Sequence, residues 1–60
     1  MMGVPDVVEV GRMARDFGVS RLVVEDACME LGLDPVGGVH RSLVEHVRQV
    51  IVAWIREGRI

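Results

Sequence analysis

The stretch Met13-Ala14-Arg15-Asp16-Phe17-Gly18-Val19-Ser20 decides the fold of this chain of 60 residues. Ala14 and Gly18 stand four residues apart, and Val24 follows six residues after Gly18. A small residue at Ala14 allows two helices to approach closely, and Gly18 suits a tight turn because glycine adopts a left-handed backbone readily. Val24 would then fill the core that the two helices share. The spacing therefore predicts two short helices that pack against each other across a tight turn.

Further glycine and serine residues mark the limits of three helices. Gly32 and Gly58 stand where helices should end, and Ser20 is a good N-cap because its hydroxyl accepts a hydrogen bond from a free backbone amide. The string Ser42-Leu43-Val44-Glu45 has the form of a capping box. We expect an all-α or mainly α single domain over residues 1–60, with three helices of which the first two form a helix-turn-helix. The expected elements are a loose N-terminus over residues 1–6, helices over residues 11–17, 20–31 and 42–57, and very short strands within Val7–Val10 and at Val36 or Val39.

The third helix carries more apolar surface than a three-helix domain of this size can cover. One stripe comprises Leu43, Val47, Val50 and Trp54, and a second comprises Val44, Ile51 and Ile55. Pairing with a second copy is the commonest way to cover such a face. We therefore expect a homodimer with Ile51, Trp54 and Ile55 at or near its interface. The alternative is a monomer in which the N-terminal strand and Ile60 cover the second stripe.

The composition excludes several classes of protein. With 50% hydrophobic residues the chain is too apolar for a disordered tail, and its longest apolar run, Val50–Ile55, is far shorter than the roughly 20 residues that span a bilayer. One small core leaves no room for an enclosed catalytic pocket, so we expect neither an enzyme nor a cofactor. All seven basic residues are arginine, lysine is absent and the net charge is -2. The use of arginine alone indicates GC-rich coding, as in actinobacteria and their phages.

Cys28, His40 and His46 have spacings that match no structural zinc site, so we expect no metal. Cys28 belongs to the apolar stripe predicted to be buried on the second helix, Val24, Ala27, Cys28 and Leu31. We expect His46 to be partly buried and hydrogen-bonded, and His40 to be exposed. A single cysteine, with no recognisable secretion signal, indicates the reducing cytoplasm.

The segment from Val10 to Leu31 resembles the helix-turn-helix of small prokaryotic and phage DNA-binding proteins. The resemblance implies a homodimeric transcriptional regulator that binds duplex DNA. The candidate nucleic-acid contacts, mainly to phosphates, are Arg12, Arg15, Ser20, Arg21 and Arg41.

A narrower resemblance involves three pieces of the chain. Val8-Glu9-Val10, the string Met13 to Ser20, and Glu30-Leu31-Gly32-Leu33 together resemble the small N-terminal domain of bacterial translation initiation factor 2. That family combines a short strand, a helix-turn-helix-like pair and a further helix. The resemblance implies a role in association with the ribosome or with another protein.

The outward face of the second helix indicates a different contact from that of a DNA-reading helix. This face carries Leu22, Glu25, Asp26 and Met29. Carboxylates repel phosphates, whereas leucine and methionine fill apolar grooves on proteins. The alternative function is therefore an adaptor or inhibitor that contacts a host or ribosomal partner through these four residues. A simpler possibility is that the charges only solvate the helix.

Overall fold

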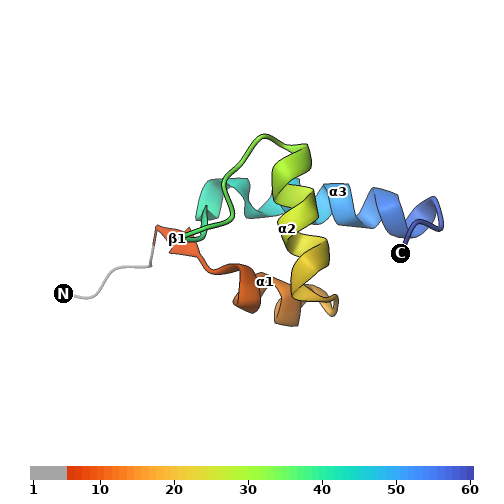
Figure 1. Ribbon diagram of the computed structural model, residues 1–60, viewed down its shortest axis with the longest axis horizontal. Helices are drawn as coiled ribbons and strands as arrows, with labels where there is room; N and C mark the ends of the chain where they lie inside the picture. Colours follow the sequence, from red (N-terminus) through yellow and green to blue (C-terminus); the bar gives the residue numbers. More distant parts are fainter. Residues whose placement is uncertain (1–5) are drawn as a thin grey trace.

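The computed structural model describes residues 6–60 and places three helices and a small sheet in one domain (Figure 1). The fold confirms the predicted mainly α, three-helix class. The expected loose N-terminus lies almost wholly outside the described residues. In chain order the elements are strand β1 (Val7–Val8), helix α1 (Val10–Phe17), helix α2 (Arg21–Glu30), strand β2 (Val39–His40), the 3-10 helix η1 (Arg41–Leu43) and helix α3 (Val44–Arg56).

The turn between α1 and α2 forms as the sequence predicts. Gly18 has a left-handed backbone with φ of 72°, and the amide of Val19 donates to the carbonyl of Ala14 at 3.0 Å. The Ser20 hydroxyl accepts a hydrogen bond from the amide of Val23 at 3.3 Å, which caps α2. Helix α1 begins at Val10, one residue earlier than expected, because the carbonyl of Glu9 already accepts the first amide hydrogen bonds of the helix.

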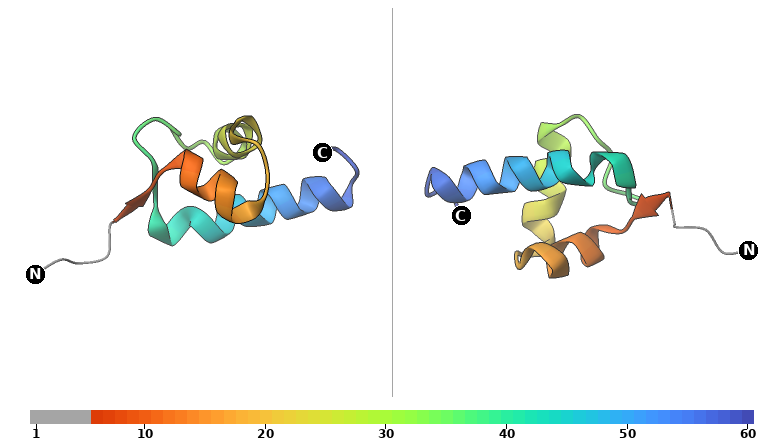
Figure 2. Two further views of the ribbon diagram at one scale, coloured as in Figure 1. Left: turned by 90° about the horizontal axis from the view of Figure 1, so that it is seen from below. Right: turned by 180° about the vertical axis from the view of Figure 1, so that it is seen from behind.

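Helix α2 is the centre of the core. It packs against both α1 and α3, and Val24, Ala27 and Cys28 have no exposed surface. In the left view of Figure 2, α2 is seen end-on beside α1 and α3. The remaining buried residues come from α1, β2 and α3, and they are Val10, Met13, Ala14, Val39, Val47, Ile51 and Trp54.

The prediction that Leu31 belongs to the buried stripe of the second helix is wrong. Helix α2 ends at Glu30, and Leu31 is its C-cap with 38% of its surface exposed. The left-handed backbone at Gly32 turns the chain, and Leu33 packs against the core instead. The amide of Leu33 donates to the carbonyl of Cys28 at 2.8 Å, so the chain reverses before Leu31 is covered.

A two-stranded antiparallel sheet joins the start of the chain to the segment before α3. Val7 pairs with His40 and Val8 with Val39, and the amide of Arg41 donates to the carbonyl of Asp6 at 2.7 Å. The first strand is shorter than the predicted Val7–Val10 because Val10 already belongs to α1. Of the two residues suggested for the second strand, Val39 lies in it.

The start of α3 differs from the predicted capping box. Ser42 lies in η1, and α3 begins at Val44 after Leu43, whose side chain makes no capping hydrogen bond. The ring nitrogen Nδ1 of His40 accepts from the amide of Ser42 at 3.2 Å, and the same nitrogen lies 2.8 Å from the Ser42 hydroxyl. The histidine that ends β2 therefore caps this turn, and Ser42 is not the cap.

Two of the three residues predicted to lie at or near a dimer interface on the third helix are buried within the single chain. Ile51 is 2% exposed and Trp54 is 9% exposed, so both belong to the core of a single chain. The guanidinium of Arg59 lies over the Trp54 ring, 5.1 Å from its centroid, and adds to this cover. Only Ile55 is exposed, on the end of α3 that extends past α2 in both views of Figure 2. Ile51 and Trp54 therefore stabilise the core of the single chain, and of the three residues only Ile55 can contact a second copy.

Two adjacent glycines give a matched test of the contact between the α2–β2 loop and β1. Gly37 and Gly38 have φ of 85° and 96°, but only at Gly38 would a Cβ meet the backbone of β1, 2.9 Å from the Val8 carbonyl oxygen. We expect Gly37→Ala to lower the free energy of unfolding by about 1–2 kcal/mol, from backbone strain alone. Gly38→Ala should lose about 1 kcal/mol or more beyond that, from the added clash. Urea unfolding of both variants measures the difference, and equal losses would show that β1 does not pack as described.

Candidate functional site

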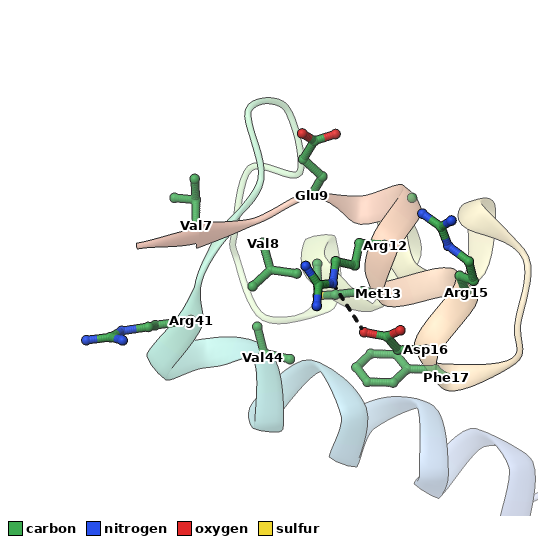
Figure 3. Close-up of a pocket in the computed structure, with 11 residues that line it drawn as sticks. Val7, Val8, Glu9, Arg12, Met13, Arg15, Asp16, Phe17, Arg41 and Val44 are labelled. Carbon is green, nitrogen blue, oxygen red and sulfur yellow. Dashed lines mark ion pairs between the residues drawn. The ribbon is translucent and has the colours of Figure 1, made fainter. Parts of the chain in front are cut away.

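Three of the five candidate nucleic-acid residues lie around one groove. Arg12, Arg15 and Arg41 line a depression of about 640 Å³ between β1, α1, η1 and the start of α3. In Figure 3, Arg12 extends toward Asp16, while Arg41 and Arg15 stand at opposite ends. We call this depression the arginine groove.

The floor of the arginine groove is apolar. Val8, Met13, Phe17 and Val44 line it; Met13 is buried and the other three are half-buried. The lining also holds two carboxylates, Glu9 and Asp16, and Asp16 lies 3.7 Å from Arg12. The groove thus combines an apolar surface with more cationic than anionic side chains at its rim.

The other two candidate nucleic-acid residues lie apart from this groove. The hydroxyl of Ser20 is engaged in capping α2. Arg21 lines a second hollow with Glu25 and the Pro35–Gly38 loop, and its Nε lies 3.7 Å from Glu25 Oε2. The five residues therefore do not form one surface.

Carboxylates pair with much of the arginine charge. Besides the Arg21–Glu25 pair, Arg12 Nε lies 3.7 Å from Asp16 Oδ2, and Arg59 Nη1 lies 3.6 Å from Glu57 Oε1. Arg48 donates from Nη2 to Glu45 Oε2 at 2.7 Å. Within residues 6–60, Arg15, Arg41 and Arg56 form no ion pair. The basic residues therefore do not merge into a continuous phosphate-binding surface.

The four residues of the alternative, protein-contact prediction lie together on α2. Leu22 is 70% exposed and Met29 is 67% exposed, and Asp26 between them is exposed as well. Glu25 is half-buried and paired with Arg21. Glu30, at the end of the helix, adds another exposed carboxylate. We call Leu22, Asp26, Met29 and Glu30 the α2 face.

Cys28, His40 and His46 were the residues considered as metal ligands. Cys28 is fully buried, and burial, followed by the negative charge of Glu25, raises the pKa of its thiol. His46 is exposed, contrary to the expectation that it is partly buried, because the inner face of α3 is formed by Val47, Ile51 and Trp54. Over residues 6–60 no three His, Cys, Asp or Glu side chains cluster in a way that could hold a metal ion.

We compared the chain with known protein families, curated proteins and solved structures. No protein-family model matches the chain, and no similar curated protein or solved structure was found. Among residues 6–60, every helix is too short or too polar to cross a membrane.

The arginine groove was not predicted as a groove from the sequence. Its arginines were candidates, but the floor formed by Val8, Phe17 and Val44 comes from three separate elements. A local signal did exist, since Arg12 and Arg15 stand three residues apart and share one face of α1. The return of Val44 to that face depends on the β1–β2 pairing, which no helical spacing encodes.

The Glu45 carboxylate provides a pH-dependent test of the surface ion pairs. Hydrogen bonds from Arg48, and then from Gln49, lower the pKa of Glu45 from an ordinary value near 4.5 to about 2. The stabilisation from this group is therefore present above about pH 4.5 and is lost as the pH falls toward 2. NMR titration should show the low pKa, and Arg48→Ala should raise it whereas Arg56→Ala should not. An ordinary pKa in the wild type would contradict the pairing.

The buried thiol predicts slow chemistry at Cys28. Because the side chain has no exposed surface and its pKa is raised, a disulfide reagent should reach it only when the domain opens. We expect labelling at pH 8 to be about a hundredfold or more slower in the native protein than in urea. Equal rates in the two conditions would show that α2 is not packed as the structure has it.

Proposed function

We propose that this protein is a non-enzymatic protein-binding module whose α2 face docks onto an apolar surface rimmed by basic residues on a partner. The observation that carries the proposal is the exposure of Leu22 and Met29 on either side of Asp26. Exposing two large apolar side chains to water on one helix face is unfavourable. Apolar patches of this kind mark interaction sites.

The spacing of the α2 face supports a helix-sized contact. Leu22 and Met29 are seven residues apart, which is two helical turns or about 10 Å along the axis. Both side chains therefore point in nearly the same direction, with Asp26 between them. A partner that covers the two apolar side chains must also meet the carboxylates of Asp26 and Glu30, so arginine or lysine near its apolar surface would complete the contact.

The same residues weigh against base reading by α2. A DNA-reading helix presents donors to base edges and cations to phosphates, whereas Asp26 and Glu30 would be brought toward phosphates by an approach of this face. The resemblance to the N-terminal domain of initiation factor 2 supports a protein- or ribosome-associated role instead. We place this function in the cytoplasm, where a single free thiol is stable.

Selection from a library of random peptides tests the proposed function. We expect the selected peptides to combine arginine or lysine with aliphatic or aromatic residues. Leu22→Ser with Met29→Ser should weaken their binding by about tenfold or more, because both side chains lose apolar contact area. The matched control changes two exposed apolar residues outside α2, Val36→Ser with Ile60→Ser, and should bind as the wild type does.

A fluorescence-anisotropy titration with a random DNA duplex at two salt concentrations tests the alternative, a DNA-binding regulator. Micromolar binding that falls steeply with salt, and that persists in the Leu22 and Met29 double variant, would support the DNA-binding regulator and overturn the proposal. Selection of acidic peptides, or binding that the double variant leaves unchanged, would also overturn it.

A further inference from the structure

The chain itself carries a surface of the kind that the α2 face requires. The arginine groove has an apolar floor of Val8, Phe17 and Val44, and Arg12, Arg15 and Arg41 stand around it. The α2 face has the opposite arrangement, with Leu22 and Met29 as apolar side chains and Asp26 and Glu30 as anions. The two surfaces are complementary in both hydrophobicity and charge.

The charged residues of the two surfaces also have compatible spacings. Asp26 and Glu30 are one helical turn apart on α2, about 6 Å along its axis, and Arg12 and Arg15 are about 4.5 Å apart along α1. Arg15 and Arg41 are in no ion pair within residues 6–60, so each is free to meet a carboxylate. Arg12 would exchange or share its contact with Asp16.

The two surfaces lie on different elements. The groove is lined by residues of β1, α1, η1 and α3, together with Glu9 between β1 and α1, whereas the other surface is on α2. A chain cannot place its own α2 face into its own groove, because α2 is fixed by the buried contacts of Val24, Ala27 and Cys28. Contact between the two surfaces therefore requires two molecules.

We propose that the arginine groove receives the α2 face of a second copy of this chain. Charge complementarity favours this occupant, since the groove is lined by three arginines against two carboxylates, whereas the charged side chains of the α2 face are both carboxylates. Each contact joins two different surfaces. It is made twice when two chains dock reciprocally in a two-fold dimer, and it is heterologous when it continues from chain to chain.

Self-association would regulate the partner binding proposed above, and in that respect it rests on the proposed function. Self-association covers Leu22 and Met29, so a partner and a second copy compete for the same α2 face. High protein concentration would favour the self-associated form, and a partner of higher affinity would release single chains from it.

Charge reversal on each surface, followed by mixing, tests the inference by sedimentation velocity. We expect the wild type to associate with increasing concentration and to dissociate with added salt. Asp26→Arg on the α2 face and Arg15→Glu in the groove should each weaken association by about tenfold or more, because like charges then meet. Arg56→Glu makes the same charge change as Arg15→Glu but lies outside both surfaces, and it should associate as the wild type does.

Mixing the two reversed variants gives the decisive result. The Asp26→Arg chain keeps an intact groove and the Arg15→Glu chain keeps an intact α2 face. The two reversed surfaces also carry opposite charges, so the mixture should associate although neither variant does so alone. A wild type that stays monomeric at millimolar concentration would overturn the proposal, as would a mixture that forms no complex. Loss of association in Ile55→Asp, with both reversed variants unaffected, would also overturn it and assign the contact to α3.

The same variants separate this inference from the proposed function. Arg15→Glu should be monomeric and yet bind the selected basic peptides, because its α2 face is unchanged. If it binds those peptides while the mixing experiment fails, only the self-association is wrong. If self-association occurs but no basic peptide is selected, the proposed partner binding is wrong and the contact between copies stands.

Discussion

The packing of α2 against two neighbours at once is the constraint on which this structure depends. Val24, Ala27 and Cys28 are completely buried, and they meet side chains from both α1 and α3. Among residues 6–60 no other helix packs against two helices in this way, and removing the inner face of α2 would leave α1 and α3 without a common core. The turn at Gly18 and the cap at Ser20 set the angle at which this helix enters.

A central helix of this kind leaves its opposite side to water or to another molecule. One face of α2 is committed to the core, so Leu22, Asp26 and Met29 are necessarily turned outward. The acidic and apolar character of that outer side then restricts what can bind there. The arginine groove lies on other elements and is shaped by the return of Val44 toward β1, so the chain presents two chemically opposite surfaces that are independent of each other.

The sequence predicted the elements that depend on local chemistry. Gly18, Ser20, Gly32 and Gly58 act where their backbone or side-chain preferences place them, and the stripe of Val24, Ala27 and Cys28 is buried. The errors concern contacts between distant segments. Ser42 is a residue type that often caps helices. The N-cap of η1 is instead His40, which is held in position by its pairing with Val7 in the sheet. Ile51 and Trp54 form part of an apolar arc that is too wide for one helical contact. Both are nevertheless buried, because they belong to the core cluster that the other elements form with α3.

The burial of Trp54 also gives the protein a built-in spectroscopic reporter. It is the sole tryptophan and the chain has no tyrosine, so ultraviolet fluorescence from the native protein comes from one ring on α3. That ring lies in the core beneath the guanidinium of Arg59, and it belongs neither to the α2 face nor to the lining of the arginine groove. Its emission therefore follows the integrity of the fold and the docking of the C-terminal residues, and is largely insensitive to what binds at either surface.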